Sequence, residues 1–138
     1  MGLQDEPLYP GMVKLIHDLK SNKEFNIGVA TNKSRIALNN GLKKHNLNEV
    51  FDITLTMEEA KPKPDPDMAI QAMSKFNIEK KSTVIVGDTI NDIGLGVNAG
   101  INSIGVAWGY NSIEMLCNQG ADFIVKDSKE LLDTIINL

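Results

Sequence analysis

Hydrophobic side chains recur along the chain with two different spacings, and these spacings alternate. After Pro10, apolar residues occupy the i, i+3, i+4 and i+7 positions at Met12, Leu15, Ile16 and Leu19, which predicts an amphipathic helix. Short runs rich in Val, Ile and Thr instead predict strands. We expect strands at 26–31, 51–56, 82–88, 102–109 and 123–126, and helices at 11–22, 32–46, 66–76, 90–100, 111–118 and from 128 onward.

Strands that alternate with helices need crossover connections, and such connections produce a parallel sheet. The predicted fold is therefore α/β, with a three-layer, Rossmann-like parallel sheet and helices on both faces. The chain contains no internal repeat and no long linker, so we expect a single domain over residues 1–138. The alternating strand at 51–56 is expected at a sheet edge.

The charge balance narrows the range of partners. The formal net charge of −4 and the pI near 5.1 provide no basic field for nucleic acid, which leaves small-molecule chemistry or protein contact. No apolar run is long enough to span a membrane, and the first residues lack the pattern of a signal peptide. We therefore expect a cytoplasmic protein with no membrane partner.

Two predicted strands end in polar residues, and ligands of open parallel sheets bind at the carboxyl ends of strands. The strand at 82–88 ends at Gly87-Asp88, and Asp92 follows one helical turn later. A buried carboxylate needs hydrogen bonds, a cation or a metal. Oxygen ligands of this kind suit Mg²⁺, although both acids could instead cap the following helix.

The other polar strand end carries Thr31 and Asn32, whose side chains and neighbouring backbone N–H groups could hold a phosphate. A simple helix cap is the alternative. Lys61 precedes Pro62, which favours an extended conformation and so restricts where the ammonium can reach. Lys61 could bind phosphoryl oxygens as a point charge or could be solvated. Lys63, in the same loop, is the alternative candidate for phosphate binding.

The segment 94–99 matches the loose glycine pattern of dinucleotide-binding proteins. In that motif the first glycine follows the strand directly, whereas here the strand ends at Asp88 and Gly94 falls within the predicted helix. We therefore do not expect a dinucleotide site.

Four segments, taken in order, resemble the haloacid dehalogenase-like hydrolase superfamily. They are YPG at 9–11, VATNKSR at 29–35, KPKPDP at 61–66 and VGDTINDIGLGVNAG at 86–100. The resemblance spans about residues 8–110 and is strongest to its phosphoglycolate-phosphatase-like members. It implies a Mg²⁺-dependent phosphomonoester hydrolase that acts on a small phosphorylated metabolite. The same resemblance implies a role for each candidate residue. Phosphate is bound by Thr31, Asn32 and Lys61. The catalytic residues are Lys61, Asp88 and Asp92, and the metal is held by Asp88 and Asp92.

Members of that family use a D-x-D pair at the end of an N-terminal first strand, and this sequence has no counterpart. Asp5 follows no apolar strand and has no second acid two residues later. We therefore expect the chain to begin after the first strand and the cap, and to be inactive by itself because nucleophile and general acid are missing. The alternative is a non-catalytic domain for phosphate binding, metal binding or assembly.

The absent strand lies centrally in the family's sheet, between the strands that match 26–31 and 82–88. Its loss would leave two strand edges and their apolar side chains uncovered, at about 1–3 kcal/mol for each unpaired buried polar group. We therefore predict either direct pairing of 26–31 with 82–88, or a strand supplied from elsewhere, by a homo-oligomer or a complementing N-terminal segment.

Overall fold

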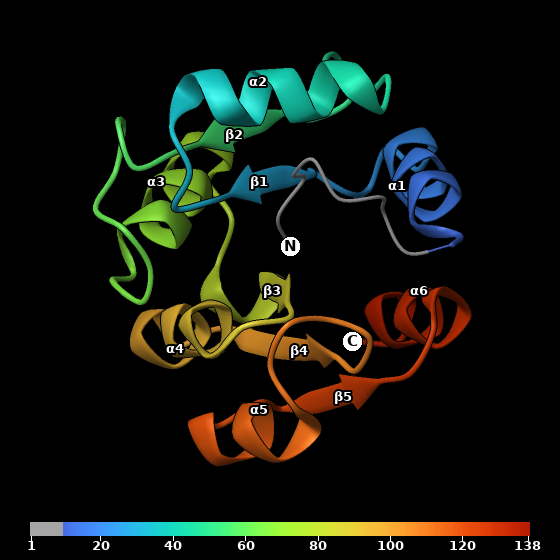
Figure 1. Cartoon of the computed structure of the whole chain (residues 1–138), viewed down its shortest axis with the longest axis vertical. Coiled ribbons are helices and arrows are strands. Elements are labelled where there is room, and N and C mark those ends of the chain that lie inside the picture. The colour runs from blue at the N-terminus through green and yellow to red at the C-terminus, as the bar shows by residue number, and fades with distance from the viewer. Residues whose placement is uncertain (1–9) are drawn as a thin grey trace.

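The computed structural model describes residues 10–138, and its strands lie in two parallel sheets (Figure 1). Strand β1 (Gly28–Ala30) pairs with β2 (Ile53–Leu55) in one sheet. The second sheet has the order β3-β4-β5, formed by β3 (Val84–Gly87), β4 (Asn102–Val106) and β5 (Phe123–Val125). The predicted parallel α/β architecture is confirmed, and β2 lies at a sheet edge as expected.

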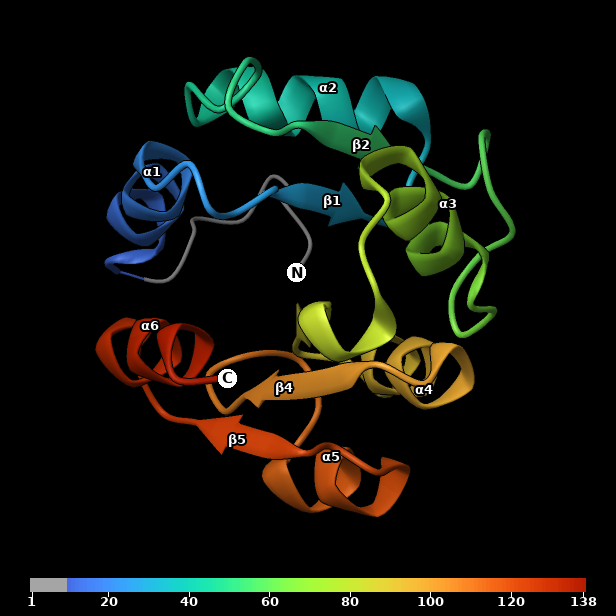
Figure 2. The same ribbon diagram turned by 180° about the vertical axis from the view of Figure 1, so that it is seen from behind.

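Six α-helices within the described residues surround the two sheets. Helices α1 and α6 lie together on one side and contact each other, while α3 and α4 do the same on the opposite side (Figure 1). Figure 2 shows the same two pairs from behind. The helices are α1 (Met12–Ser21), α2 (Arg35–Lys44), α3 (Asp67–Phe76), α4 (Ile90–Ala99), α5 (Ile113–Gln119) and α6 (Ser128–Ile136), and a 3₁₀ helix (Lys80–Ser82) precedes β3.

Two clusters of buried side chains form the core, one on each side of the strands. The cluster beneath α1 and α6 is formed by Met12, Leu15, Ile16, Val29, Leu38, Leu42, Leu47, Ile104, Val106, Val125 and Leu131. The cluster beneath α3 and α4 is formed by Leu55, Ala60, Met68, Ala69, Leu95, Ala99 and Ile101. Apolar cores on both faces give the three layers that the hydrophobic pattern predicts.

The helix starts follow the local sequence. Thr89 caps α4 by accepting a hydrogen bond from the backbone N–H of Asp92, and Ser34 caps α2 in the same way through Ala37. Helix α3 begins at Asp67, one residue later than predicted, because Asp65 turns its carboxylate back to the N–H of Asp67 and Pro66 occupies the cap position.

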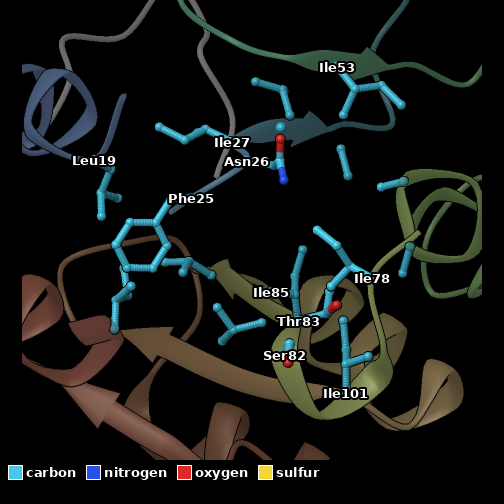
Figure 3. Close-up of a pocket in the computed structure, with 18 of the residues that line it drawn as sticks. Leu19, Phe25, Asn26, Ile27, Ile53, Ile78, Ser82, Thr83, Ile85 and Ile101 are labelled. Atoms are coloured by element: carbon cyan, nitrogen blue, oxygen red, sulfur yellow. The ribbon is translucent and has the colours of Figure 1, made fainter. Parts of the chain in front are cut away.

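The prediction that 26–31 pairs directly with 82–88 is wrong. Among the described residues, β1 pairs with β2 and β3 pairs with β4, and a cavity of about 660 Å³ lies between β1 and β3 (Figure 3). The contacts of α1 with α6 and of α3 with α4 link the helices of the two halves on either side of this cavity. We call this cavity between β1 and β3 the inter-sheet slot.

Some sequence features lie outside the described residues. These are Asp5 and the Tyr9 of the YPG segment, on which part of the family resemblance rests. Within 10–138, every helix is too short or too polar to cross a membrane.

Candidate functional site

The ammonium of Lys63 joins the carboxyl ends of β1 and β3. Its Nζ donates a hydrogen bond of 2.8 Å to the carbonyl oxygen of Ala30, the last residue of β1. The same Nζ forms an ion pair with Oδ1 of Asp92, a residue of the first turn after β3. The ends of two strands from separate sheets therefore meet at one lysine, as expected for a site at the carboxyl edge of a parallel sheet.

The loop 61–66 is fixed on both sides, which positions Lys63. The side-chain amide of Asn32 accepts a hydrogen bond from the backbone N–H of Lys63 (2.7 Å) and donates one to its carbonyl (3.1 Å). On the other side, the side chain of Asn98 donates to the carbonyl of Pro64 at 2.8 Å.

Gly94 lets the Pro64 ring approach α4, since a Cβ there would lie 2.8 Å from Pro64. Gly94 and Gly96 thus serve packing, and Gly94 lies within α4 as predicted.

The structure differs from the expectation that Lys61 faces the phosphate. Lys61 is exposed, and its backbone N–H donates to the carboxylate of Asp67. The Lys63 side chain, by contrast, is only 8% exposed. The reason is the pairing of Asn32 with the backbone of Lys63, which sets the register of the loop and which sequence spacing does not reveal.

Asp92 is the most buried acid of the site, at 2% exposure. Its Oδ1 faces Lys63, and its Oδ2 accepts hydrogen bonds from the backbone N–H groups of Asp88 and Thr89 and from the Thr89 hydroxyl. Gly87 makes this close approach feasible, because a Cβ at that position would overlap the Asp92 carboxylate. With both oxygens engaged, Asp92 acts here as a positioning residue and not as an open metal ligand.

Burial raises the pKa of Asp92, whereas the Lys63 ammonium and the hydrogen bonds from Lys63 and Thr89 lower it. The pKa falls from 3.8 to about 2. A carboxylate whose pKa is lowered on folding contributes stability that is present above the unfolded-state pKa and is lost as the pH falls through the folded-state pKa.

We therefore expect Asp92 to contribute roughly 2 kcal/mol at pH 5, and this contribution to disappear by about pH 2. Urea unfolding of the wild type and of Asp92→Asn across this range measures it. The stability difference between the two proteins should shrink by roughly 2 kcal/mol as the pH falls. A difference that stays constant with pH would contradict this assignment.

Asp88 stands directly after β3 and is held by the loop after β4. Its Oδ2 accepts a hydrogen bond of 2.9 Å from the backbone N–H of Tyr110, and its carbonyl accepts one of 3.0 Å from Asn111. Gly109 packs so closely on Asp88 that a Cβ there would overlap the carboxylate. The sequence gives no signal for these contacts, because residues 109–111 lie far from Asp88 along the chain.

Thr31 follows β1 and is 4% exposed. Its backbone N–H donates to the carbonyl of Leu55, and its hydroxyl oxygen accepts a hydrogen bond from the N–H of Lys33. Among the described residues, Lys63 uses two of its three ammonium donors. The hydroxyl of Thr31 and the third donor of Lys63 are therefore the groups suited to a phosphoryl oxygen, whereas the amide of Asn32 is engaged by the loop.

The donor set fits a divalent cation only in part. The described residues contain no group of three His, Cys, Asp or Glu side chains that could enclose a metal. Asp88 offers one carboxylate, and Mg²⁺ commonly takes one or two carboxylates and completes its shell with water and phosphate oxygens. Asp88 is thus the one acid of this site that suits Mg²⁺.

Known proteins resemble this chain in sequence and in fold. A family model described as haloacid dehalogenase-like hydrolase matches residues 4–106. The chain belongs to this family. The curated pyrophosphatase PpaX of Bacillus velezensis is 30% identical over 125 residues, which cover 90% of this chain and 57% of that protein.

Solved structures of the family share the fold. A predicted phosphatase from Clostridium acetobutylicum has a TM-score of 0.82 and 31% identity, covering 94% of this chain and 60% of that structure. A predicted phosphoglycolate phosphatase from Haemophilus somnus has a TM-score of 0.85 and 26% identity, covering 93% and 57%. This haloacid dehalogenase-like chain therefore spans little more than half the length of its relatives.

Proposed function

We propose that this haloacid dehalogenase-like chain carries the phosphate-binding and Mg²⁺-binding part of a phosphomonoester hydrolase. The observation that supports the proposal most directly is the Lys63 bridge, which gathers the ends of β1 and β3 around one cation. In this scheme Lys63 and Thr31 bind the phosphoryl oxygens, and Asp88 holds Mg²⁺. Phosphatases of this family generally use Mg²⁺, which bound here would neutralise charge on the phosphoryl group.

Neither of the two described carboxylates at this site is placed to attack phosphorus, because Asp92 is bonded through both oxygens and Asp88 is the proposed Mg²⁺ ligand. Asp92 is buried with both oxygens bonded, and Asp88 has one oxygen held by Tyr110. Nucleophilic catalysis requires a group with an open path to the reacting atom. We therefore propose that the chain alone binds phosphate and Mg²⁺ but does not hydrolyse phosphomonoesters.

A second candidate is a non-catalytic domain that keeps the pocket for binding or assembly. The engagement of Asp92 and Asn32 by other protein groups favours it, because both residues serve structure here and touch no open position. The two candidates differ in whether turnover appears when the missing part of the family chain is supplied. They agree on binding by the chain alone.

The first experiment is an NMR titration of the chain with MgCl₂ and inorganic phosphate. We expect shifts near Asp88 with Mg²⁺ and near Thr31 and Lys63 with phosphate. Asp88→Asn should strongly weaken Mg²⁺ binding and retain the fold, which circular dichroism checks. Binding that leaves these residues unperturbed would overturn the proposed site.

The second experiment is a hydrolysis assay with p-nitrophenyl phosphate and pyrophosphate in the presence of Mg²⁺. We expect no turnover by the chain alone, and turnover once an N-terminal family segment with its D-x-D strand is added. Strong turnover by the chain alone, abolished by Asp88→Asn, would refute the claim that chemistry needs residues outside 10–138. No turnover even with the segment bound would favour the binding domain.

A further inference from the structure

The side chain of Arg35, the first residue of α2, binds the outer edge of β2. Its guanidinium donates hydrogen bonds to the hydroxyl oxygen (2.7 Å) and to the carbonyl oxygen (2.9 Å) of Thr54. Because the carbonyl of Leu55 binds β1 and peptide groups alternate in direction along a strand, the carbonyl of Thr54 points away from β1. Arg35 therefore ties the start of α2 to the strand beside it (Figure 1).

The same guanidinium holds the turn that follows β2. It forms an ion pair with Oε1 of Glu59, and this oxygen also accepts hydrogen bonds from the backbone N–H (2.8 Å) and the hydroxyl (2.9 Å) of Thr56. Thr56 is fully buried, which anchors the carboxylate of Glu59 to the interior. The hydrogen bond from Arg35 is the main cause that lowers the pKa of Glu59, so this carboxylate is ionised at neutral pH.

Backbone contacts join the segment 31–35 to the same turn. The N–H of Met57 donates to the carbonyl of Lys33 at 3.3 Å, and the carboxylate of Glu58 accepts a hydrogen bond from the N–H of Arg35. The loop 61–66 holds the other side of the segment through Asn32. The segment that carries the Thr31 hydroxyl is therefore fixed from two directions, by loop 61–66 and by the turn after β2.

We propose that Arg35 and Glu59 are positioning residues for phosphate binding, which act by fixing the segment that carries Thr31. The proposal rests on the proposed function, because it takes Thr31 and Lys63 as the phosphate-binding groups. A planar guanidinium that reaches acceptors on both β2 and the following turn restricts the start of α2 more than a single ion pair does. A partly exposed ion pair adds little to folding stability, so its effect should appear in the position of this segment.

The first test is an NMR titration of Arg35→Ala with inorganic phosphate and, separately, with MgCl₂. We expect phosphate binding to weaken at least about fivefold, because the Thr31 hydroxyl loses its fixed place. Binding of Mg²⁺ should change by less than about twofold, since Asp88 is held by separate contacts with residues 110 and 111. The amide signals of Thr31 and Asn32 should also shift before any phosphate is added.

Lys20→Ala is the matched control, because it breaks another partly exposed ion pair beside the same strand. The ammonium of Lys20 lies 2.7 Å from the carboxylate of Asp52, which directly precedes β2, whereas Glu59 lies beyond the carboxyl end of β2. This substitution removes the same charge at the end of β2 away from the site. It should leave both the phosphate affinity and the amide signal of Thr31 unchanged.

Glu59→Gln separates positioning from long-range attraction of the phosphate. The substitution removes a negative charge, so attraction by charge alone predicts tighter phosphate binding. Positioning predicts weaker binding, because Arg35 loses its ionic partner on the turn. The double variant Arg35→Ala/Glu59→Gln should bind phosphate no more weakly than Arg35→Ala alone. This comparison keeps the test valid if Arg35→Ala does not fold, which circular dichroism checks.

Several outcomes would overturn the inference. One is a phosphate affinity of folded Arg35→Ala equal to that of the wild type. An equal loss in Lys20→Ala would show a general effect on the β1–β2 sheet, and tighter binding by Glu59→Gln would show an effect of charge alone. Each of these results leaves the phosphate site of the wild type intact. A wild type that binds no phosphate would instead overturn the proposed function, and the inference with it.

Discussion

Replacing Lys63 with alanine is expected to lower the free energy of unfolding by about 3 kcal/mol. The ammonium is the cationic partner of Asp92, and the two side chains are only 8% and 2% exposed. Its removal leaves a buried carboxylate without a counter-charge. The cost should lie near the low end for such pairs, because Asp92 keeps the hydrogen bonds from Asp88 and Thr89. Urea denaturation at pH 7 measures the change.

Lys61→Ala is the matched control, since it removes the same type of side chain from the same loop. Lys61 is exposed, and its substitution should change stability by less than about 0.5 kcal/mol. Lys63→Met keeps the aliphatic stem and removes only the charge, so it should resemble Lys63→Ala if the ion pair dominates. Equal effects of the two alanine substitutions would show that the loop sits in a different register.

Introducing a methyl group at Gly109 is expected to weaken Mg²⁺ binding by about 10-fold to 100-fold. A Cβ at this position would overlap Asp88, so the carboxylate must move from its place beside the Tyr110 N–H. The loss arises although Gly109 itself contributes no ligand. A titration with MgCl₂, followed by NMR, measures the affinity of Gly109→Ala.

A double-mutant cycle with Asp88→Asn separates this route from general damage to the fold. If Gly109 acts through Asp88, the double variant should bind Mg²⁺ no more weakly than Asp88→Asn alone. Additive losses would indicate that the methyl group disturbs the site by another path. A Mg²⁺ affinity of Gly109→Ala equal to that of the wild type would remove Asp88 from the proposed metal site.

The order of helices and strands was predictable from hydrophobic spacing, and the element ends were not. The predicted strand 102–109 ends at Val106, because the ladder with β3 ends at Gly105 and the ladder with β5 at Val106. The chain then turns toward residues 109–111, which contact Asp88. The predicted strand 26–31 shortens to Gly28–Ala30 for a related reason. Thr31 and Asn32 serve the site and its loop, so the regular strand stops before them.

The site was predictable to the level of the segments that meet, but not to the level of each side chain. Asp88 and Asp92 stand at a strand end, and that much follows from spacing. Which lysine turns inward depends on the amide of Asn32, a contact between residues 31 positions apart. The direct pairing of β1 with β3 failed as a prediction, because β1 pairs with β2 and β3 with β4, and strand spacing along the sequence does not reveal these partners.

The core beneath α1 and α6 has a consequence for how the molecule unfolds. It joins Val29 of one sheet with Ile104 and Val125 of the other, although no ladder within 10–138 connects the two sheets. Side-chain packing, together with the hydrogen bond and ion pair of Lys63, therefore couples the melting of the β1–β2 half to that of the β3–β5 half. Loosening the contact between α1 and α6 would turn one cooperative transition into two, with the halves denaturing in succession.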